Sequence, residues 1–154
     1  MPRLATATGC HVNLAVTDLE RSVDWWCRVF GLIVVGDEAS VEPASEEPLR
    51  YRSLGSPQTW SYVVGLIQHQ AGSQDAADEL RAGLDHYALH VPELADLDEW
   101  AAHLDALEVP HSGIKRTDYA ACITLRDPDN IQLELHWPNL DFWAGRFAAA
   151  VSPS

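Results

Sequence analysis

Two histidines and one glutamate stand at matching points of a pattern that the chain repeats. His11 begins the apolar run HVNLAV at 11–16, and His86 begins the similar run HYALHV at 86–91. Glu134 is the one charged residue in the apolar run IQLEL at 131–135. Two imidazoles and one carboxylate are a suitable ligand set for a divalent metal ion. The repeat therefore predicts a metal site made by His11, His86 and Glu134.

Each of these residues also has a purely structural interpretation. A single histidine on a strand is often a hydrogen-bonded structural residue, and Glu134 alone would fit an edge strand that faces water. Their equivalent placement in the two repeats favours the metal site over three unrelated structural roles.

Residues an even number of positions from the predicted ligands should share their face of the strand. Asn13, His90 and His136 meet this condition, so we expect them to face the same site. His90, His136 and Tyr119 are candidate catalytic acids or bases, because histidine titrates near neutral pH and a phenol can hold a proton. The alternative for the two histidines is a position that simply faces solvent.

The elements that must hold these residues follow the order strand, helix and three strands. In the first repeat we expect a strand at 11–16, a helix that a Thr17–Glu20 capping box opens and Gly31 ends, and strands at 32–35, 49–54 and 60–68. The helix should bury a face made by Leu19, Val23, Trp26 and Phe30. Alternation along 60–68 would place Tyr62 on the same face as Val64 and Leu66, with Gly65 on the other. The segment 36–60 is long for a connection, which predicts either a mobile flap or a surface loop.

The second repeat shows the same order after a polar segment, 71–83, that reads as a short helix or a linker. We expect a strand at 86–91, then a helix that Asp96 and Glu99 cap, and strands at 119–125 and 131–136 joined by the turn DPDN at 127–130. The helix should bury Leu97, Trp100, Leu104 and Leu107. A final helix at 139–151 should bury Leu140, Phe142, Trp143 and Phe147.

Composition excludes several classes of partner. The formal net charge of −13 argues against binding to nucleic acid or to an anionic membrane surface. Cys10, Cys27 and Cys122 are odd in number and widely spaced, which argues against a disulfide framework or a zinc knuckle. Neither a signal peptide nor a run of about 20 apolar residues is recognisable, so we expect a cytoplasmic protein with no membrane span.

The repeated βαβββ order, the strand-initial His11 and His86, and the pattern Asp127-Pro128-Asp129 followed by Glu134 resemble the vicinal oxygen chelate superfamily. This superfamily includes glyoxalase I, bleomycin-resistance proteins, fosfomycin-resistance enzymes and type I extradiol dioxygenases. The resemblance covers about 11–137. It implies an α+β fold of two tandem βαβββ modules whose curled mixed sheets form a cup, with the helices outside. It implies one domain, with module one at about 8–70, a linker at 71–83, module two at 84–137 and a C-terminal helix at 139–151.

The resemblance also assigns the ligands. His11 matches the first-strand ligand of module one, His86 that of module two, and Glu134 the last-strand ligand of module two. A fourth family position, glutamate or glutamine in glyoxalase-like members, falls on Gly65, which has no ligand atom and argues against glyoxalase I chemistry. His69 would replace it only if the strand register shifted. The expected cofactor is a divalent metal ion, Fe2+ first, with Mn2+, Ni2+ and Zn2+ as alternatives.

Two functions from different classes fit these features. The first is a metal-dependent enzyme that acts on a small oxygen-chelating molecule, such as an aromatic one, with extradiol-dioxygenase-like or lyase- or isomerase-like chemistry. Its pocket would include Asn13, Gly65 and, at the mouth, Trp60. The second is a non-catalytic protein of the bleomycin-resistance type that sequesters an antibiotic, which the acidity and the six tryptophans would suit. The resemblance further implies a homodimer. Two arrangements stay open: the site forms within one chain, or His11 of one chain completes a site with His86 and Glu134 of the other.

Overall fold

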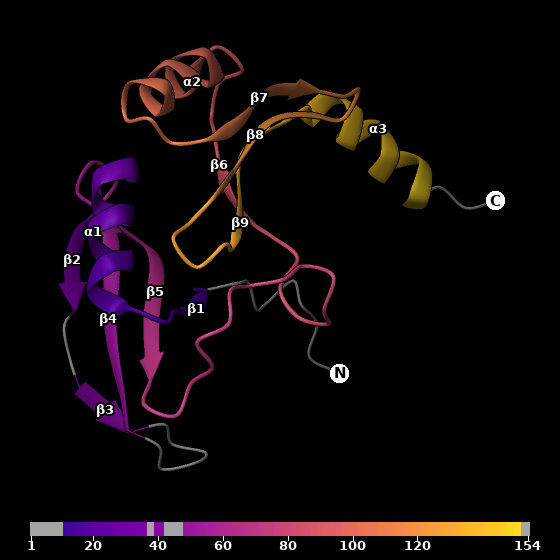
Figure 1. The fold of residues 1–154 in the computed structure, drawn as a ribbon. Helices are drawn as coiled ribbons and strands as arrows, with labels where there is room; N and C mark the ends of the chain where they lie inside the picture. Colours follow the sequence, from indigo (N-terminus) through magenta and orange to yellow (C-terminus); the bar gives the residue numbers. More distant parts are fainter. Residues whose placement is uncertain (1–10, 37–38, 42–47, 152–154) are drawn as a thin grey trace. The chain divides into compact units, whose positions relative to one another are not determined.

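The computed structural model describes residues 11–36, 39–41 and 48–151. The chain divides into two compact units, residues 1–76 and 77–154. This boundary falls in the segment 71–83, which contains neither helix nor strand. Each unit contains strand, helix and further strands in the repeated order, as Figure 1 shows. The α+β class and the two-module organisation are confirmed.

The first unit is a mixed sheet with one helix. Its elements are β1 (Asn13–Ala15), α1 (Leu19–Phe30), β2 (Ile33–Gly36), β3 (Ala39–Val41), β4 (Pro48–Ser56) and β5 (Ser61–His69). The strand order is β1-β5-β4-β2, and β3 pairs with β4. β1 and β5 run parallel, and the other pairs are antiparallel. Much of the predicted flap at 36–60 is therefore strand, because β3 and β4 pair with each other; residues 37–38 and 42–47 lie outside the described residues.

The first helix begins with a different cap from the predicted one. Asp18 is the N-cap residue, and its side chain accepts a hydrogen bond of 3.1 Å from the backbone N–H of Arg21. The Thr17–Glu20 capping box is therefore wrong by one residue, and Glu20 instead forms ion pairs with Arg50 and Arg52 of β4. Gly31 ends the helix at a φ of 64°, as predicted, because glycine adopts this left-handed conformation without steric cost.

One face of α1 packs on one face of the sheet. Leu19, Trp26 and Val29 are fully buried, together with Leu54 of β4 and with Val64 and Leu66 of β5. Phe30, expected in this face, is only half-buried. Residues 13 and 15 of β1 point away from the helix and are exposed, whereas Leu14 between them is buried. The side of the sheet away from α1 is thus left to the polar residues of β1 and β5.

The second unit repeats this plan. Its elements are β6 (Tyr87–His90), α2 (Asp96–Ala106), β7 (His111–Arg116), β8 (Ala120–Arg126), β9 (Gln132–Pro138) and α3 (Leu140–Val151). The strand order is β6-β9-β8-β7, and β6 and β9 run parallel. Leu97 and Leu104 of α2 are buried, as are Ile123 of β8 and Leu133 of β9. Trp100 and Leu107, expected on the same face of α2, are half-buried.

Two local details of this unit test the sequence patterns. The predicted capping pair of α2 is wrong: the N-cap residue is Ala95, and it makes no side-chain capping hydrogen bond. The turn at 127–130 forms as predicted, with Asn130 at a φ of 65°. Asp127 closes it, because its Oδ1 accepts hydrogen bonds from the backbone N–H groups of Asp129 and Ile131, at 2.9 and 2.8 Å.

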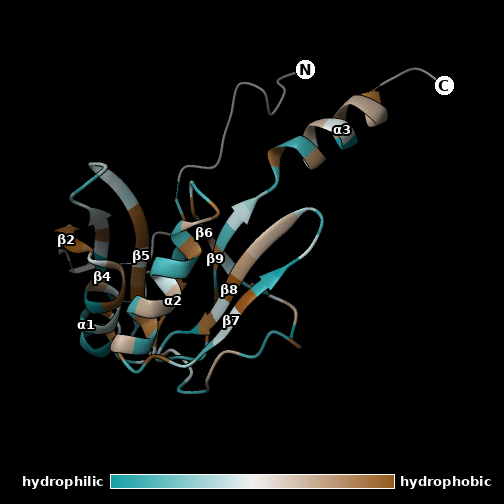
Figure 2. Cartoon of the chain, turned by 90° about the horizontal axis from the view of Figure 1, so that it is seen from above, coloured by the Kyte–Doolittle hydropathy of each residue, from teal (hydrophilic) through white to brown (hydrophobic). Residues whose placement is uncertain are grey.

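The last helix forms where the sequence predicts it but does not bury its apolar residues. None of the residues Leu140–Val151 is buried within the described chain. Leu140 and Phe147 are 70% and 68% exposed, and Figure 2 shows apolar positions along α3. The predicted burial of Leu140, Phe142, Trp143 and Phe147 is therefore wrong for a single chain: α3 runs on from the end of β9 and gains only partial contacts, through Phe142 and Trp143.

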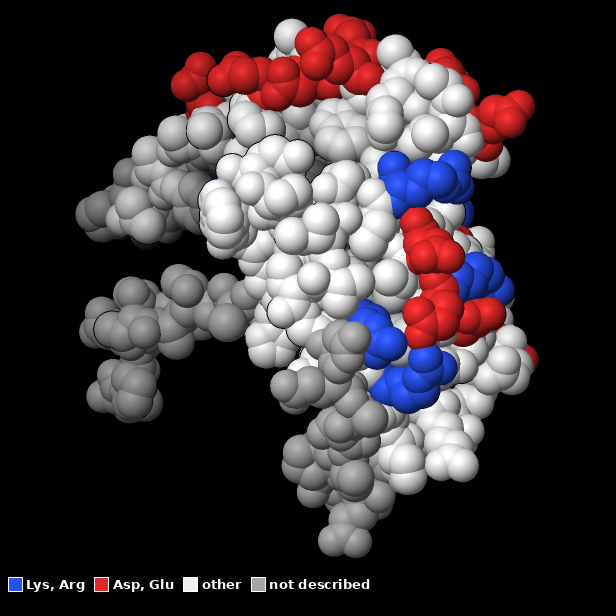
Figure 3. Space-filling view, turned by 90° about the vertical axis from the view of Figure 1, so that its left-hand side faces the viewer, with Lys and Arg blue, Asp and Glu red and all other residues white. Residues whose placement is uncertain are grey.

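Charge is distributed differently over the two helices that cover the sheets. Acidic side chains gather on α2, whose first turn contains Asp96, Asp98 and Glu99 (Figure 3). On α1 the charges alternate in sign, and Glu20 pairs with arginines of β4. The first turn of α2 thus carries a cluster of acidic side chains. Among the described residues, no helix is long and apolar enough to cross a membrane.

Candidate functional site

The side of the second sheet away from α2 carries the predicted site residues of this unit. Along β9, Leu133 and Leu135 are buried, whereas Glu134 and His136 are half-buried on the other face. The parallel register with β6 pairs Ala88 with Glu134 and His90 with His136. Strand alternation and this register therefore bring Glu134, His136 and His90 to one face, as the sequence predicts.

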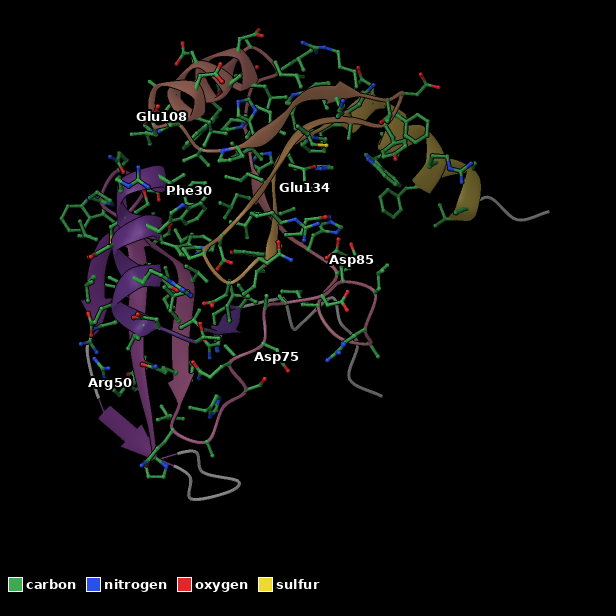
Figure 4. The ribbon with its side chains drawn as sticks, in the orientation of Figure 1. Phe30, Arg50, Asp75, Asp85, Glu108 and Glu134 are labelled. Carbon is green, nitrogen blue, oxygen red and sulfur yellow. The ribbon has the colours of Figure 1, made fainter. Side chains whose placement is uncertain are left out.

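His86 approaches Glu134 from the residue before β6. Its Nε2 lies 3.8 Å from Oε2 of Glu134, and its Nδ1 lies 2.5 Å from Oδ1 of Asp85. Figure 4 labels Asp85 and Glu134. The contact of Asp85 with Nδ1 orients the ring, so that Nε2 is the nitrogen that faces Glu134. No sequence motif singled out Asp85, although an acidic residue beside a predicted histidine ligand is a usable signal.

The separation of these two donor atoms fits a shared metal ion. Metal–nitrogen and metal–oxygen bonds are each about 2.1 Å, so two ligands of one ion lie no more than about 4.2 Å apart. The 3.8 Å between His86 Nε2 and Glu134 Oε2 satisfies this condition. Within the described residues, however, no group of three or more His, Cys, Asp or Glu side chains is arranged to hold a metal ion. In the second unit, His86 and Glu134 are thus two potential donors at a distance that one ion could span.

Two further side chains contact Glu134. His136 Nδ1 lies 3.3 Å from Oε2, the oxygen that also faces His86. Cys122 of β8, which pairs with His136 in the register, places its Sγ 3.9 Å from Oε1. Burial raises the pKa of the Cys122 thiol, and the negative charge of Glu134 raises it further. Cys122 is therefore a neutral donor to the carboxylate, and no sequence motif singled it out.

In the first unit, His11 and Asn13 meet Tyr62. The rings of His11 and Tyr62 are 5.8 Å apart at 78°, an edge-to-face contact. The Tyr62 hydroxyl donates a hydrogen bond of 2.9 Å to Oδ1 of Asn13. Gly65 pairs with Asn13 in the parallel register of β1 and β5. His69, the predicted substitute for a ligand at Gly65, pairs with Leu49 four residues further along β5.

The place of Tyr62 differs from the prediction, which put it on the face of Val64 and Leu66. Those two residues are fully buried, whereas Tyr62 is 37% exposed, and a Cβ built on Gly65 would lie 2.4 Å from its hydroxyl. The cause is a β-bulge, because Leu54 pairs with Val64 but Gly55 pairs with Tyr62. The extra residue, Val63, reverses the alternation and turns Tyr62 to the side of Gly65.

Two predicted site residues lie apart from these groups. Tyr119 precedes β8 at the end where α3 begins, and its ring contacts Phe142 and Trp143. Trp60 lies in the turn between β4 and β5, is 94% exposed and adopts a φ of 53°. Neither is brought together with Glu134 or His11 by the contacts of the described residues.

Comparison with known proteins agrees with this architecture. Residues 10–135 match the model of the Glyoxalase/Bleomycin resistance protein/Dioxygenase superfamily. A glyoxylase/bleomycin resistance protein/dioxygenase domain from Frankia sp. EAN1pec superposes with a TM-score of 0.70 at 24% identity, covering 86% of this chain and 93% of that one. The fosfomycin resistance protein FosX from Listeria monocytogenes gives 0.59 at 17% identity, covering 88% and 96%. The lactoylglutathione lyase from Agrobacterium tumefaciens gives 0.55 at 20% identity, covering 85% and 93%.

Among curated proteins, no sequence matches the chain. The structural similarities are below 25% identity and establish the fold alone. The family match spans most of the chain and includes both repeats. The chain belongs to the Glyoxalase/Bleomycin resistance protein/Dioxygenase superfamily.

Proposed function

We propose that this protein is a metal-dependent enzyme that acts on a small molecule with neighbouring oxygen atoms. The observation that carries the proposal is the convergence of His86 Nε2 and Glu134 Oε2, 3.8 Å apart, with Asp85 on the far nitrogen of the imidazole. A metal-binding imidazole is usually held by a carboxylate or carbonyl at its other ring nitrogen, which is the place of Asp85 beside His86. Family membership supports the same assignment.

The proposed ligands are His86, Glu134 and, from the first unit, His11. The case for His11 is its equivalence to His86 in the repeat and in the family pattern. Gly65 provides no fourth ligand atom, so a metal held by three residues would keep positions for substrate oxygens. Fe2+ is the first candidate, and Mn2+, Ni2+ or Zn2+ also suit two imidazoles and one carboxylate. The bound ion would supply Lewis acidity and fix the orientation of the substrate.

The remaining side chains near Glu134 suit proton handling. His136 is half-buried and 3.3 Å from Glu134, and His90 is its exposed neighbour in the register. We assign the catalytic acid or base to His136 or His90, because an imidazole gives and accepts protons near neutral pH. Tyr119 is a weaker candidate, since its ring contacts α3. Asn13 and Gly65 are proposed pocket residues of the first unit, with Trp60 at the edge.

Metal content tests the proposal directly. Anaerobically purified wild type, His86→Ala and Glu134→Ala would be compared by plasma mass spectrometry, with His103→Ala of α2 as the matched control. We expect near-stoichiometric metal in the wild type and the control, and loss of metal in the two site variants. Wild type that stays folded and binds none of Fe2+, Mn2+, Ni2+ and Zn2+ on reconstitution would overturn the enzyme and favour an antibiotic-sequestering protein.

The origin of His11 can be tested by mixing variants. In a homodimer that shares its sites between chains, His11→Ala and Glu134→Ala would each lack metal alone, and co-refolding them would restore about half of one site per two chains. Sites formed within one chain would give no recovery. Loss of metal in His11→Ala is expected in both cases, and its retention would remove His11 from the ligand set.

A further inference from the structure

We propose that Tyr62 is a positioning residue: its ring holds His11 in place, and its hydroxyl orients Asn13 toward a ligand oxygen. The part that concerns His11 rests on the proposed function, in which His11 binds the metal. Neither the sequence pattern nor the alternation of β5 selects Tyr62, because it reaches this face only through the bulge at Val63.

The contact with His11 is the first part of the argument. His11 is exposed and precedes β1, so the strand alone does not fix its ring. The edge-to-face contact with Tyr62, 5.8 Å between ring centres, limits the rotation of the imidazole. A ligand whose orientation is set before the metal arrives loses less conformational freedom on binding, and so binds more tightly.

The hydrogen bond to Asn13 is the second part. The Tyr62 hydroxyl donates to Oδ1 of Asn13 at 2.9 Å, so the amide oxygen is directed at Tyr62. Asn13 is exposed on the same face as His11. With its oxygen engaged, the amide offers its two N–H donors, which recognise an acceptor such as a carbonyl or phenolate oxygen.

Gly65 makes the hydrogen bond between Tyr62 and Asn13 possible in the first unit. A Cβ at residue 65 would lie 2.1 Å from Asn13 Oδ1 and 2.4 Å from the Tyr62 hydroxyl. Glycine therefore makes room for the hydrogen bond. In the second unit the corresponding pair is Ala88 with Glu134. The position that the family pattern gives to a fourth ligand is thus filled here by a hydrogen-bonded tyrosine–asparagine pair.

Variants that remove the whole Tyr62 ring or only its hydroxyl test the two parts of the proposal separately. Zn2+ affinity would be measured by competition with a chromophoric chelator, and binding of 4-nitrocatechol to the Zn2+-loaded protein by its absorbance. We expect Tyr62→Leu to weaken Zn2+ binding about fivefold. Tyr62→Phe keeps the ring and should therefore have the Zn2+ affinity of the wild type. We expect Tyr62→Phe and Asn13→Ala each to weaken 4-nitrocatechol binding about fivefold, with no further loss in the double variant.

The control is Tyr87→Phe, which removes a tyrosine hydroxyl next to His86 in the sequence. It should change neither the Zn2+ affinity nor the 4-nitrocatechol affinity. A purely structural role for Tyr62 would lower thermal stability without separating the two affinities. Equal Zn2+ affinity in Tyr62→Leu and wild type, or 4-nitrocatechol binding unchanged in Tyr62→Phe, would overturn the proposal.

A measurement without metal separates this inference from the proposed function. The ring protons of His11 should show a ring-current shift in NMR spectra of the metal-free protein, retained in Tyr62→Phe and lost in Tyr62→Leu. If the shift behaves in this way but wild type binds none of Fe2+, Mn2+, Ni2+ and Zn2+, the metal proposal fails and the contact stands. If Zn2+ binds and the shift is absent, the positioning role fails.

Discussion

The two units share one topology but differ at one pair of facing residues on their parallel strands. In the first unit the first strand carries the polar side chain, and in the second unit the last strand does. In the second unit Glu134 of β9 faces Ala88 of β6, and in the first unit Asn13 of β1 faces Gly65 of β5. Each row thus pairs one polar side chain with one small residue. Neighbouring side chains across a strand pair lie within about 5.5 Å, so a small partner gives the larger one space to turn. The repeat keeps the space and changes its occupant from a carboxylate to a neutral amide.

The last two strands of each unit differ as well. β8 and β9 pair without a shift from Ala120–Pro138 to Arg126–Gln132, whereas β4 and β5 shift at Gly55. The regular pair keeps Glu134 and His136 in alternation on one face. The bulged pair adds Tyr62 to the face of Gly65. The face of the first sheet thereby gains a phenol, whereas that of the second carries the imidazole of His136 and the thiol of Cys122 beside Glu134.

The largest expected effect is on metal affinity, and it comes from substitutions of the two polar side chains, Glu134 and Asn13. Glu134→Gln should lower metal affinity at least about hundredfold, because it removes the only negatively charged ligand in the proposed set. Asn13→Asp should not restore binding in the Glu134→Gln background, since residue 13 is directed at the Tyr62 hydroxyl. Isothermal titration with Zn2+ measures both variants. Recovery in the double variant would show that the two rows are interchangeable.

A second prediction concerns the turn that holds β9 in register. Asp127→Ala removes the acceptor of two backbone N–H groups in a buried turn, and should lower the free energy of unfolding by about 2 kcal/mol. Asn130→Gly in the same turn is the control: glycine adopts the positive φ readily, and only the hydrogen bond from Asn130 Nδ2 to the Ala77 carbonyl is lost, so the cost should be about 1 kcal/mol or less. Urea unfolding followed by tryptophan fluorescence measures the difference. Equal midpoints for the two variants would contradict this role of Asp127.

The smallest expected effect concerns the segment that leads into the second unit. Arg126 of β8 donates hydrogen bonds to both carboxylate oxygens of Glu79, at 2.6 and 2.9 Å, and these lower the pKa of Glu79 to about 2. Because the folded-state pKa lies below the ordinary value, the ionised form favours the folded state. This contribution is complete above about pH 4.5 and is lost as the pH falls toward 2.

NMR titration of the Glu79 carboxyl carbon measures the pKa. We expect Arg126→Gln to return it to the ordinary range, and Glu79→Gln to remove this part of the acid dependence of stability. An unchanged pKa in Arg126→Gln would mean that the pairing is not maintained in solution.

Several features follow from the sequence because they depend on local or periodic properties. The βαβββ repeat, the end of α1 at Gly31 and the turn at 127–130 were predicted from periodicity and from residues that tolerate positive φ. The sequence also placed His136 on the face of Glu134. Side chains alternate wherever the backbone is extended, so this pattern predicts the faces of a strand whose pairing is regular.

Other features depend on partners that are distant in the sequence. The helix caps were mispredicted because capping depends on the backbone angles at the junction, which decide that Asp18 and not Thr17 reaches the first turn. Burial of α3 was mispredicted because an apolar face is buried only where another surface meets it. Tyr62 was assigned to the wrong face because a bulge arises from the pairing of β5 with β4, which periodicity along one strand does not contain.

The sequence by itself thus determined the repeat, the faces of the regularly paired strands and the residue types that can bind a metal. The tertiary structure alone decided that His86 and Glu134 approach within 3.8 Å, that Asp85 holds the imidazole, and that Tyr62 joins His11 and Asn13. Residue types and their period can be read along a single segment of the chain. Distances between atoms depend on strand register, which is set only when two segments pair.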